Sequence, residues 1–176
     1  MIVILMGVSG VGKTTIGRLL AMRTRWNFED ADDYHSEENR RKMAAGIPLT
    51  DADRTPWLEA LHARMLHYQQ KGENAVFACS ALKQQYRALL AGGFGPGEIH
   101  FVYLRAPAAV IRERMKSRRH SFMNPDLLDS QLAELEVPRN AWPVSVAGTP
   151  EEAVEEILAR MREVGLVTAA AGKRHD

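Results

Sequence analysis

The sequence predicts an α/β fold, a three-layer arrangement in which helices cover both faces of a central parallel sheet. Short apolar runs recur at residues 2–6, 75–78, 99–104 and 144–147, and segments with helical spacing lie between them. This alternation is typical of parallel sheets. The glycine-rich stretch GVSGVGKT follows the first apolar run directly and leads into a helical pattern. Strand, glycine turn and helix in that order indicate a phosphate-binding unit.

Length and composition point to one domain. The chain has 176 residues, with 45% apolar and 26% charged side chains. We expect the domain to span residues 1–165 and residues 166–176 to form a frayed tail. The net charge of +1 gives no electrostatic case for binding nucleic acid or a membrane. The single cysteine, Cys79, is expected to be a buried thiol in a reducing compartment, and we expect a cytoplasmic protein.

The remaining elements follow from periodicity. A short further strand is expected at residues 26–29. Helices are expected at residues 13–24, 36–45, 56–71, 81–91, 107–118, 126–135 and 150–164, with boundaries good to a few residues. Thr55 and Pro56 suit the N-cap and first position of the third helix, and Thr149 and Pro150 suit the same positions of the last.

The phosphate loop makes the chain a nucleoside triphosphate-binding protein. Its glycines permit a tight turn, and its N–H groups can converge on an anion at a helix N-terminus. Lys13 can reach the β- and γ-phosphates, and Thr14 can place its hydroxyl on Mg²⁺. The expected ATP contacts within this stretch are Gly7, Val8, Ser9, Gly10, Val11, Gly12, Lys13, Thr14 and Thr15.

Acidic residues after the second strand suit an acceptor site. The segment DADDYH, residues 30–35, lies where ligands of open parallel sheets bind. A carboxylate there can orient an acceptor hydroxyl and accept its proton. Asp32 is our candidate catalytic base and a candidate support for Mg²⁺, and His35 is a candidate substrate contact. The alternative is that these residues only form a turn and a helix cap.

Basic residues in three segments suit the anions of a phosphorylation reaction. Arg54 follows a polar loop, and Lys83 and Arg87 share one face of a predicted helix, so all three are candidate substrate contacts. If Thr55 caps the helix, Asp53 is free for other work, although an Asp53–Arg54 surface pair is an alternative. A solvated basic face explains Lys83 and Arg87 equally well.

The basic stretch 112–120 precedes a loop that we expect to form a mobile lid at about residues 116–126. Arg114 and Arg118 lie four residues apart on one helix face. Arginines on such a lid can close over the phosphates and stabilise the charge in transfer, which makes both candidate ATP contacts and Arg118 a catalytic candidate. Cations at a helix C-terminus also complement its dipole, and the two explanations can hold for different residues of the stretch.

Taken together, these segments resemble the gluconate kinase family. The matching blocks are MGVSGVGKT, DADDYH, NRRKMAAGIPLTDADRTPWL, CSALKQQYR, the arginine-rich stretch and LLDSQLAELEVP, in order from about residue 5 to 138. The resemblance implies ATP:D-gluconate 6-phosphotransferase activity in sugar-acid catabolism, a fold like that of nucleoside-monophosphate and shikimate kinases, dependence on Mg²⁺ and a homodimer. The chain departs from the family at Ala31, where a glycine is usual, and around His120 in the lid.

Two other functions remain open on sequence grounds. A kinase of the same fold can act on another small acceptor, such as shikimate or a nucleotide. A nucleotide-dependent switch without transfer activity needs neither an acceptor carboxylate nor a basic set for binding an acid.

Overall fold

The computed structural model describes residues 1–117 and 127–167, and its centre is a five-stranded, all-parallel sheet. The strands are β1 (Ile2–Met6), β2 (Asn27–Asp30), β3 (Ala75–Ala78), β4 (Ile99–Arg105) and β5 (Trp142–Ser145), in the spatial order β2-β3-β1-β4-β5. The predicted fold class is therefore confirmed. The second strand begins one residue later than expected and the last begins two residues earlier.

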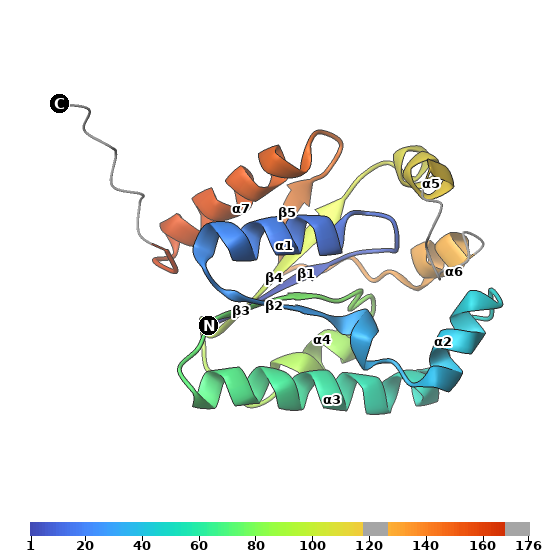
Figure 1. Ribbon diagram of the computed structural model, residues 1–176, viewed down its shortest axis with the longest axis horizontal. Coiled ribbons are helices and arrows are strands. Elements are labelled where there is room, and N and C mark those ends of the chain that lie inside the picture. The colour runs from blue at the N-terminus through green and yellow to red at the C-terminus, as the bar shows by residue number, and fades with distance from the viewer. Residues whose placement is uncertain (118–126, 168–176) are drawn as a thin grey trace.

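Helices cover both faces of the sheet (Figure 1). The upper layer in that view holds α1 (Lys13–Thr24) and α7 (Pro150–Glu163), and the lower layer holds α3 (Asp51–Gln70) and α4 (Gln84–Ala91). The 3₁₀ helix η1 (Ala31–Tyr34) and the helices α2 (Glu37–Ala44), α5 (Ala108–Ser117) and α6 (Leu127–Glu134) gather at one end. That end is where the strands finish. None of the described helices is both long and apolar enough to cross a membrane.

Alternation along the strands divides the core between the two layers. Val3 and Leu5 of β1 belong to the cluster under α1 and α7, whereas Ile2, Ile4 and Met6 belong to the cluster over α3 and α4. All five are completely buried. A strand buried on both faces reads as a continuous apolar run, which is why β1 was easy to predict. Cys79 is buried as expected.

The start of the third helix was predicted wrongly. The helix begins at Asp51, and its N-cap is Thr50, whose hydroxyl accepts from the Asp53 N–H while the Asp53 carboxylate accepts from the Thr50 N–H. This capping box outweighs the Thr55–Pro56 signal because it satisfies two free backbone donors at once. Pro56 lies inside the helix, so the carbonyl of Ala52 loses an N–H partner. The last helix does begin as predicted, with Thr149 capping and Pro150 in the first turn.

The C-terminal end of the domain extends slightly further than we expected. Leu166 and Val167 pack against the core cluster under α1 and α7, and the Leu166 N–H donates to the Met161 carbonyl at 2.8 Å. These two residues belong to the domain and not to a frayed tail. Residues 168–176 and most of the predicted lid, residues 118–126, lie outside the described part of the chain.

Candidate active site

The phosphate loop has the backbone geometry that the sequence predicted. Gly7, Gly10 and Gly12 have φ values of 141°, 81° and 104°, a region that residues with a Cβ rarely adopt. At Gly7 a Cβ would also lie only 2.7 Å from the Leu104 carbonyl oxygen. The loop is held to the segment after β3 because the Gly7 N–H donates to the Ser80 carbonyl at 3.2 Å. These glycines let the loop turn sharply between β1 and α1.

The lysine and threonine that end the motif contact the loop and the acidic segment. The Lys13 ammonium donates to the carbonyls of Gly7 at 2.9 Å and Val8 at 3.0 Å, so it curls over the loop. The Thr14 hydroxyl donates to Oδ2 of Asp30 at 2.7 Å. The first turn of α1 and the end of β2 therefore face one another across the sheet edge.

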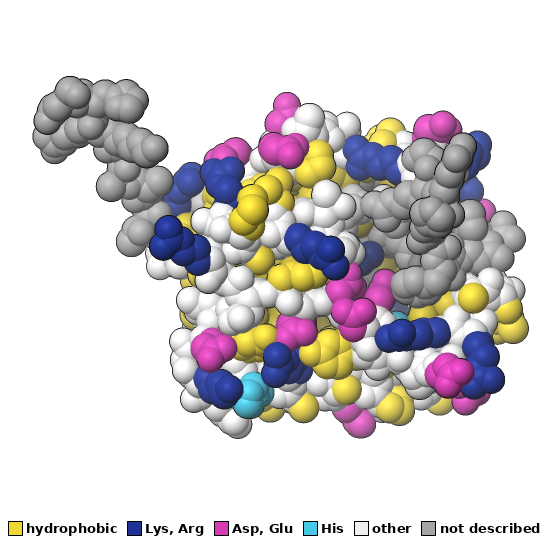
Figure 2. Space-filling view, viewed as in Figure 1, with side chains coloured by type: hydrophobic (Ala, Val, Ile, Leu, Met, Phe, Trp, Pro, Cys, Tyr) yellow, Lys and Arg dark blue, Asp and Glu magenta, His cyan; other side chains and the backbone are white. Residues whose placement is uncertain are grey.

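The three aspartates of residues 30–33 differ in their surroundings. Asp30 caps η1 by accepting from the Asp32 N–H at 3.1 Å, and it also receives the Thr14 hydroxyl. Burial raises the pKa of Asp32, and the nearby Lys13 ammonium acts in the opposite direction. Asp33 is exposed. Acidic side chains gather on the surface where β2 runs into η1, between the layer of α1 and that of α3 (Figure 2).

Sequence reasoning singled out Asp32 in this segment and missed the contact of Asp30 with Thr14. The sequence displays Asp30, but its pairing with Thr14 depends on the order of the strands in the sheet. Ala31 does not have a positive φ, as expected for a residue that replaces a glycine without strain. The acidic turn is tied to α3 because the Trp57 indole N–H donates to the Ala31 carbonyl at 2.7 Å.

Oxygen ligands for a divalent cation are present at this edge, although few in number. Among residues 1–117 and 127–167, no group of three or more His, Cys, Asp or Glu side chains could hold a metal ion. Mg²⁺ is ordinarily bound through one or two carboxylates, substrate phosphates and water. The hydroxyl of Thr14 beside the carboxylate of Asp30 matches that need.

His35 is buried directly after the acidic turn. Its ring stacks on Trp57 with centroids 4.3 Å apart and planes inclined by 12°. The residue is 8% exposed, and its Nδ1 is buried without a hydrogen-bond partner in the described structure. Burial, with the positive charges of Arg40 and Arg54, lowers the pKa of His35 to about 4. The ring is therefore neutral at neutral pH.

Arg54 and Lys83 come together around Tyr86, but each is held by an acidic residue. Nη2 of Arg54 lies 2.8 Å from Oε2 of Glu134, and its Nη1 donates to the Tyr86 hydroxyl at 2.8 Å. Among the residues that the structure describes, Glu134 Oε2 has no hydrogen-bond partner, so this contact is an ion pair. Lys83 Nζ lies 2.7 Å from Asp51 Oδ1, which the Tyr86 hydroxyl also contacts.

The Asp53–Arg54 pair that we gave as an alternative does not form, because Asp53 pairs with Lys42 and Arg54 with Glu134. Asp53 caps α3 and accepts from the Lys42 ammonium at 2.7 Å, so it is not free as we had expected.

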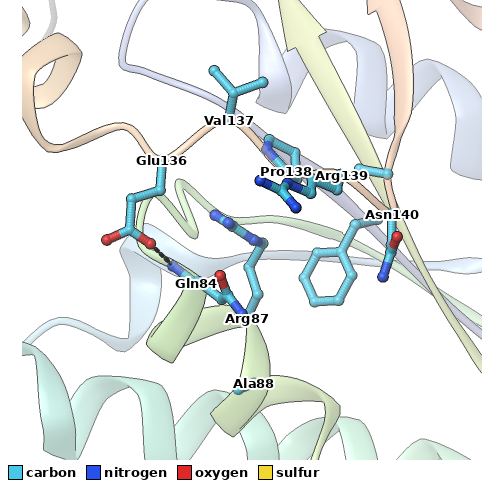
Figure 3. A pocket seen from close by; sticks show the side chains of 10 residues that line it. Gln84, Arg87, Ala88, Glu136, Val137, Pro138, Arg139 and Asn140 are labelled. Carbon is cyan, nitrogen blue, oxygen red and sulfur yellow. Dashed lines mark hydrogen bonds between the residues drawn. The ribbon is translucent and has the colours of Figure 1, made fainter.

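Arg87 lies apart from these groups. Lys83 is the N-cap of α4 and therefore precedes the helix, so the predicted shared face does not form. The Arg87 guanidinium donates to the carbonyls of Ala81 at 2.9 Å and Leu82 at 2.8 Å. It lines a separate cavity of about 600 Å³ with Arg139, where Glu136 accepts from the Gln84 N–H (Figure 3).

Arg114 lies beside the phosphate loop. A cavity of about 160 Å³ separates the loop from the connection between β5 and α7, and Arg114 and Thr15 line it together with Gly10, Gly12 and Thr149. Nη2 of Arg114 donates to the Gly148 carbonyl at 3.3 Å. Arg118 lies outside the described residues, so its predicted role is not tested.

Comparison with known proteins identifies the family. The chain is 43% identical over 180 residues to a probable gluconokinase of Mus musculus, covering 92% of this chain and 96% of the relative. The chain belongs to the gluconokinase family. A gluconokinase of Gluconobacter oxydans is 43% identical, with 88% of each chain covered. The crystal structure of a gluconokinase from Sinorhizobium meliloti 1021 matches with a TM-score of 0.81 and 41% identity, covering 92% of this chain and 91% of that one.

The wider relationship agrees with the fold. The shikimate kinase family model matches residues 9–162, and shikimate kinase-like proteins are P-loop kinases that use ATP. Within this gluconokinase fold, sequence reasoning missed the acidic and amide partners of the site, namely Asp30, Asp51, Gln131 and Glu134. The SQLAELE segment that carries the last two was visible as a motif, but no pattern in it assigns a partner.

Proposed function

We propose that this chain is a gluconokinase that transfers the γ-phosphoryl group of ATP to the 6-hydroxyl of D-gluconate. The observation that carries the proposal is the phosphate loop with Lys13, which faces the aspartates after β2 across the carboxyl edge of the sheet. An ATP-binding loop opposite a carboxylate is the arrangement that phosphoryl transfer to a hydroxyl needs. Membership of the gluconokinase family indicates that the acceptor is gluconate.

ATP would bind along the loop that ends at Thr15. The backbone N–H groups and Lys13 would hold the phosphates, and the cavity lined by Arg114 would receive the rest of the nucleotide. The Lys13 ammonium contacts loop carbonyls, so its side chain is long enough to reach across the loop. Arg118, in the predicted lid, is proposed to stabilise charge on the transferring group.

Mg²⁺ would be held by the Thr14 hydroxyl and an aspartate, with Asp30 the nearer carboxylate and Asp32 the one that we predicted from sequence. When bound there, the ion would neutralise charge that builds on the phosphates during transfer. Thr14 and Asp30 already point at one another, so both oxygens lie at one spot beside the phosphate loop.

Gluconate would lie between η1 and the N-terminal end of α3. Asp32 would orient the 6-hydroxyl and accept its proton, and the buried Nδ1 of His35 would bind another hydroxyl. Arg54 and Lys83 are the cations for the carboxylate, and each would exchange an internal acidic partner for the substrate. Arg87 remains a weaker candidate because it lines a different cavity.

The test is an ADP-release assay with gluconate, other sugar acids, shikimate and a nucleoside monophosphate as acceptors. We expect gluconate to give by far the highest kcat/KM, and phosphorus NMR of the product to show a phosphate ester at carbon 6. Turnover of shikimate or a nucleotide in preference to gluconate would favour a different acceptor. ATP binding without ADP release for any acceptor would indicate a switch.

Asp32→Asn tests whether Asp32, and not a neighbouring aspartate, is the catalytic base. The substitution keeps size and hydrogen bonding but removes the charge, and general-base help is worth about 10²–10⁴-fold, with a loose transition state favouring the lower end. We expect kcat to fall about 10²-fold while ATP and gluconate still bind. Asp33→Asn is the matched control because Asp33 is exposed, and it should remain active. A dead Asp33→Asn with an active Asp32→Asn would place the base one residue away.

We further propose a cytoplasmic homodimer, as the family resemblance implies. Light scattering coupled to size-exclusion chromatography would test the oligomeric state, and a mass near that of one 19.7 kDa chain would refute it.

A further inference from the structure

Helix α6 contacts both halves of the candidate active site. It lies at the carboxyl end of the sheet, and its eight residues follow the undescribed segment directly (Figure 1). Gln131 reaches the phosphate loop at Ser9, and Glu134 reaches Arg54 on α3. These two residues are three apart and therefore lie on the same side of the helix.

The Gln131 amide makes two hydrogen bonds to a single residue of the loop. Its Oε1 accepts from the Ser9 N–H at 2.7 Å, and its Nε2 donates to the Ser9 hydroxyl at 3.0 Å. A backbone N–H can only donate, so the amide oxygen must face it and the orientation is determined. The Ser9 N–H belongs to the loop whose donors converge on phosphate. A side-chain oxygen therefore occupies a donor for which a nucleotide phosphate competes.

At the other end of this helix face, the Glu134 carboxylate contacts Arg54, the arginine proposed to bind the acceptor. Arg54 is largely buried, and its Nη2 lies 2.8 Å from Glu134 Oε2. A guanidinium binds carboxylates through its planar edge, so a substrate carboxylate and Glu134 compete for the same donors.

We propose that Gln131 is a positioning residue through which α6 couples nucleotide binding to acceptor binding. The inference rests on the proposed function. When phosphate oxygens accept from the Ser9 N–H, Gln131 loses that hydrogen bond and α6 is released from the loop. Glu134 then leaves Arg54, and the guanidinium binds the acceptor carboxylate instead. Nucleotide therefore raises affinity for gluconate, and gluconate raises affinity for nucleotide by the same factor, as linkage requires.

The experiment measures the Kd of gluconate by calorimetry, with and without a non-hydrolysable ATP analogue and Mg²⁺. For the wild type we expect the analogue to tighten gluconate binding by about fivefold or more. In Gln131→Ala the helix is already released, so gluconate alone should bind about as tightly as it binds the wild type with the analogue. The ratio of the two constants should then fall to near one. A merely structural role for Gln131 predicts weaker gluconate binding, which is the opposite sign.

Two further variants keep the test decisive. Glu134→Gln removes the competing charge without touching the phosphate loop, and it should likewise tighten gluconate binding in the absence of nucleotide. Asp129→Asn is the matched control, because it breaks the exposed ion pair between Asp129 of α6 and Arg112. The ratio of the gluconate Kd without and with the analogue should be unchanged in this variant. Thermal melts establish that each variant is folded.

A wild-type ratio near one, or a wild-type ratio preserved in both Gln131→Ala and Glu134→Gln, overturns the coupling. Failure of the wild type to release ADP with gluconate overturns instead the proposed function on which it rests.

Discussion

Replacing His35 by phenylalanine should make the fold less sensitive to acid. The His35 ring is buried against Trp57, and its pKa is lowered to about 4 by burial and by the charges of Arg40 and Arg54. A phenylalanine keeps an aromatic ring on Trp57 but binds no proton. The comparison isolates the contribution of this one imidazole to the pH dependence of stability.

The sign and size follow from proton linkage. An unfolded histidine titrates near its ordinary value of 6.5 and folded His35 has a pKa of about 4, so the unfolded chain binds more protons between these values. The stability contribution is complete above about pH 6.5 and is lost as the pH falls toward 4. Between pH 7 and pH 5 the wild type should lose about 2 kcal/mol through this residue alone. That is a large fraction of the stability of a typical domain.

Urea unfolding at pH 8, 7 and 5 measures the effect. Any packing cost of the larger ring is the same at each pH and cancels in the difference. Between pH 8 and 7 wild type and His35→Phe should change in parallel. Between pH 7 and 5 the free energy of unfolding of the variant should fall by about 2 kcal/mol less. Equal losses in both proteins would show that His35 is not held neutral by burial.

Four further substitutions test the proposed site. Lys13→Ala should abolish transfer while leaving the melting temperature unchanged, and near-normal turnover would remove the phosphate loop from the chemistry. Arg54→Ala should raise the KM for gluconate more than that for ATP, because one charge-assisted pair is worth about 1.5–3 kcal/mol of binding free energy. We expect Arg87→Ala to behave in the same way. A normal gluconate KM in both variants would leave Lys83 to hold the carboxylate. Arg118→Ala should lower kcat and leave the gluconate KM near normal, and an effect on gluconate affinity alone would move it into the acceptor pocket.

The strands and the phosphate loop were predictable from sequence because each depends on local signals. Strand β1 is buried on both faces, so it needs apolar side chains at every position. The loop needs glycine wherever φ is positive, as at Gly10 and Gly12. Where two local signals competed, prediction was less secure. Thr50 and Thr55 both suit an N-cap, and only the reciprocal bond with Asp53 decides between them.

The charge pairing of the site was not predictable, because it joins segments far apart in sequence. Arg54 and Glu134 are 80 residues apart, and Lys83 and Asp51 are 32 apart. A sequence displays the cations but not the acids that neutralise them in the fold. Reading Arg54 and Lys83 as available for substrate was therefore incomplete, since each must give up an internal partner first.

The meeting of Thr14 with Asp30 shows how strand order builds a site that no local pattern contains. In the sheet, Asp30 of β2 is level with Ala78 of β3, which is level with Leu5 of β1. Strands lie about 4.8 Å apart, so β3 separates the acid from the start of the phosphate loop by two strand spacings, roughly 10 Å. Helix α1 crosses above β3, and Thr14 in its first turn spans the gap to Asp30.

Because β3 lies between β1 and β2, the Asp30 carboxylate is two strand spacings from the loop, where the proposed phosphates would bind, and still within reach of Thr14. Were β2 paired directly with β1, the acid would lie one strand spacing from the loop and crowd the phosphates. A slip of one residue in the register of β2 would turn Asp30 to the opposite face and remove it from Thr14. The acidic side of the proposed active site therefore depends on pairing across the sheet as much as on the residues themselves.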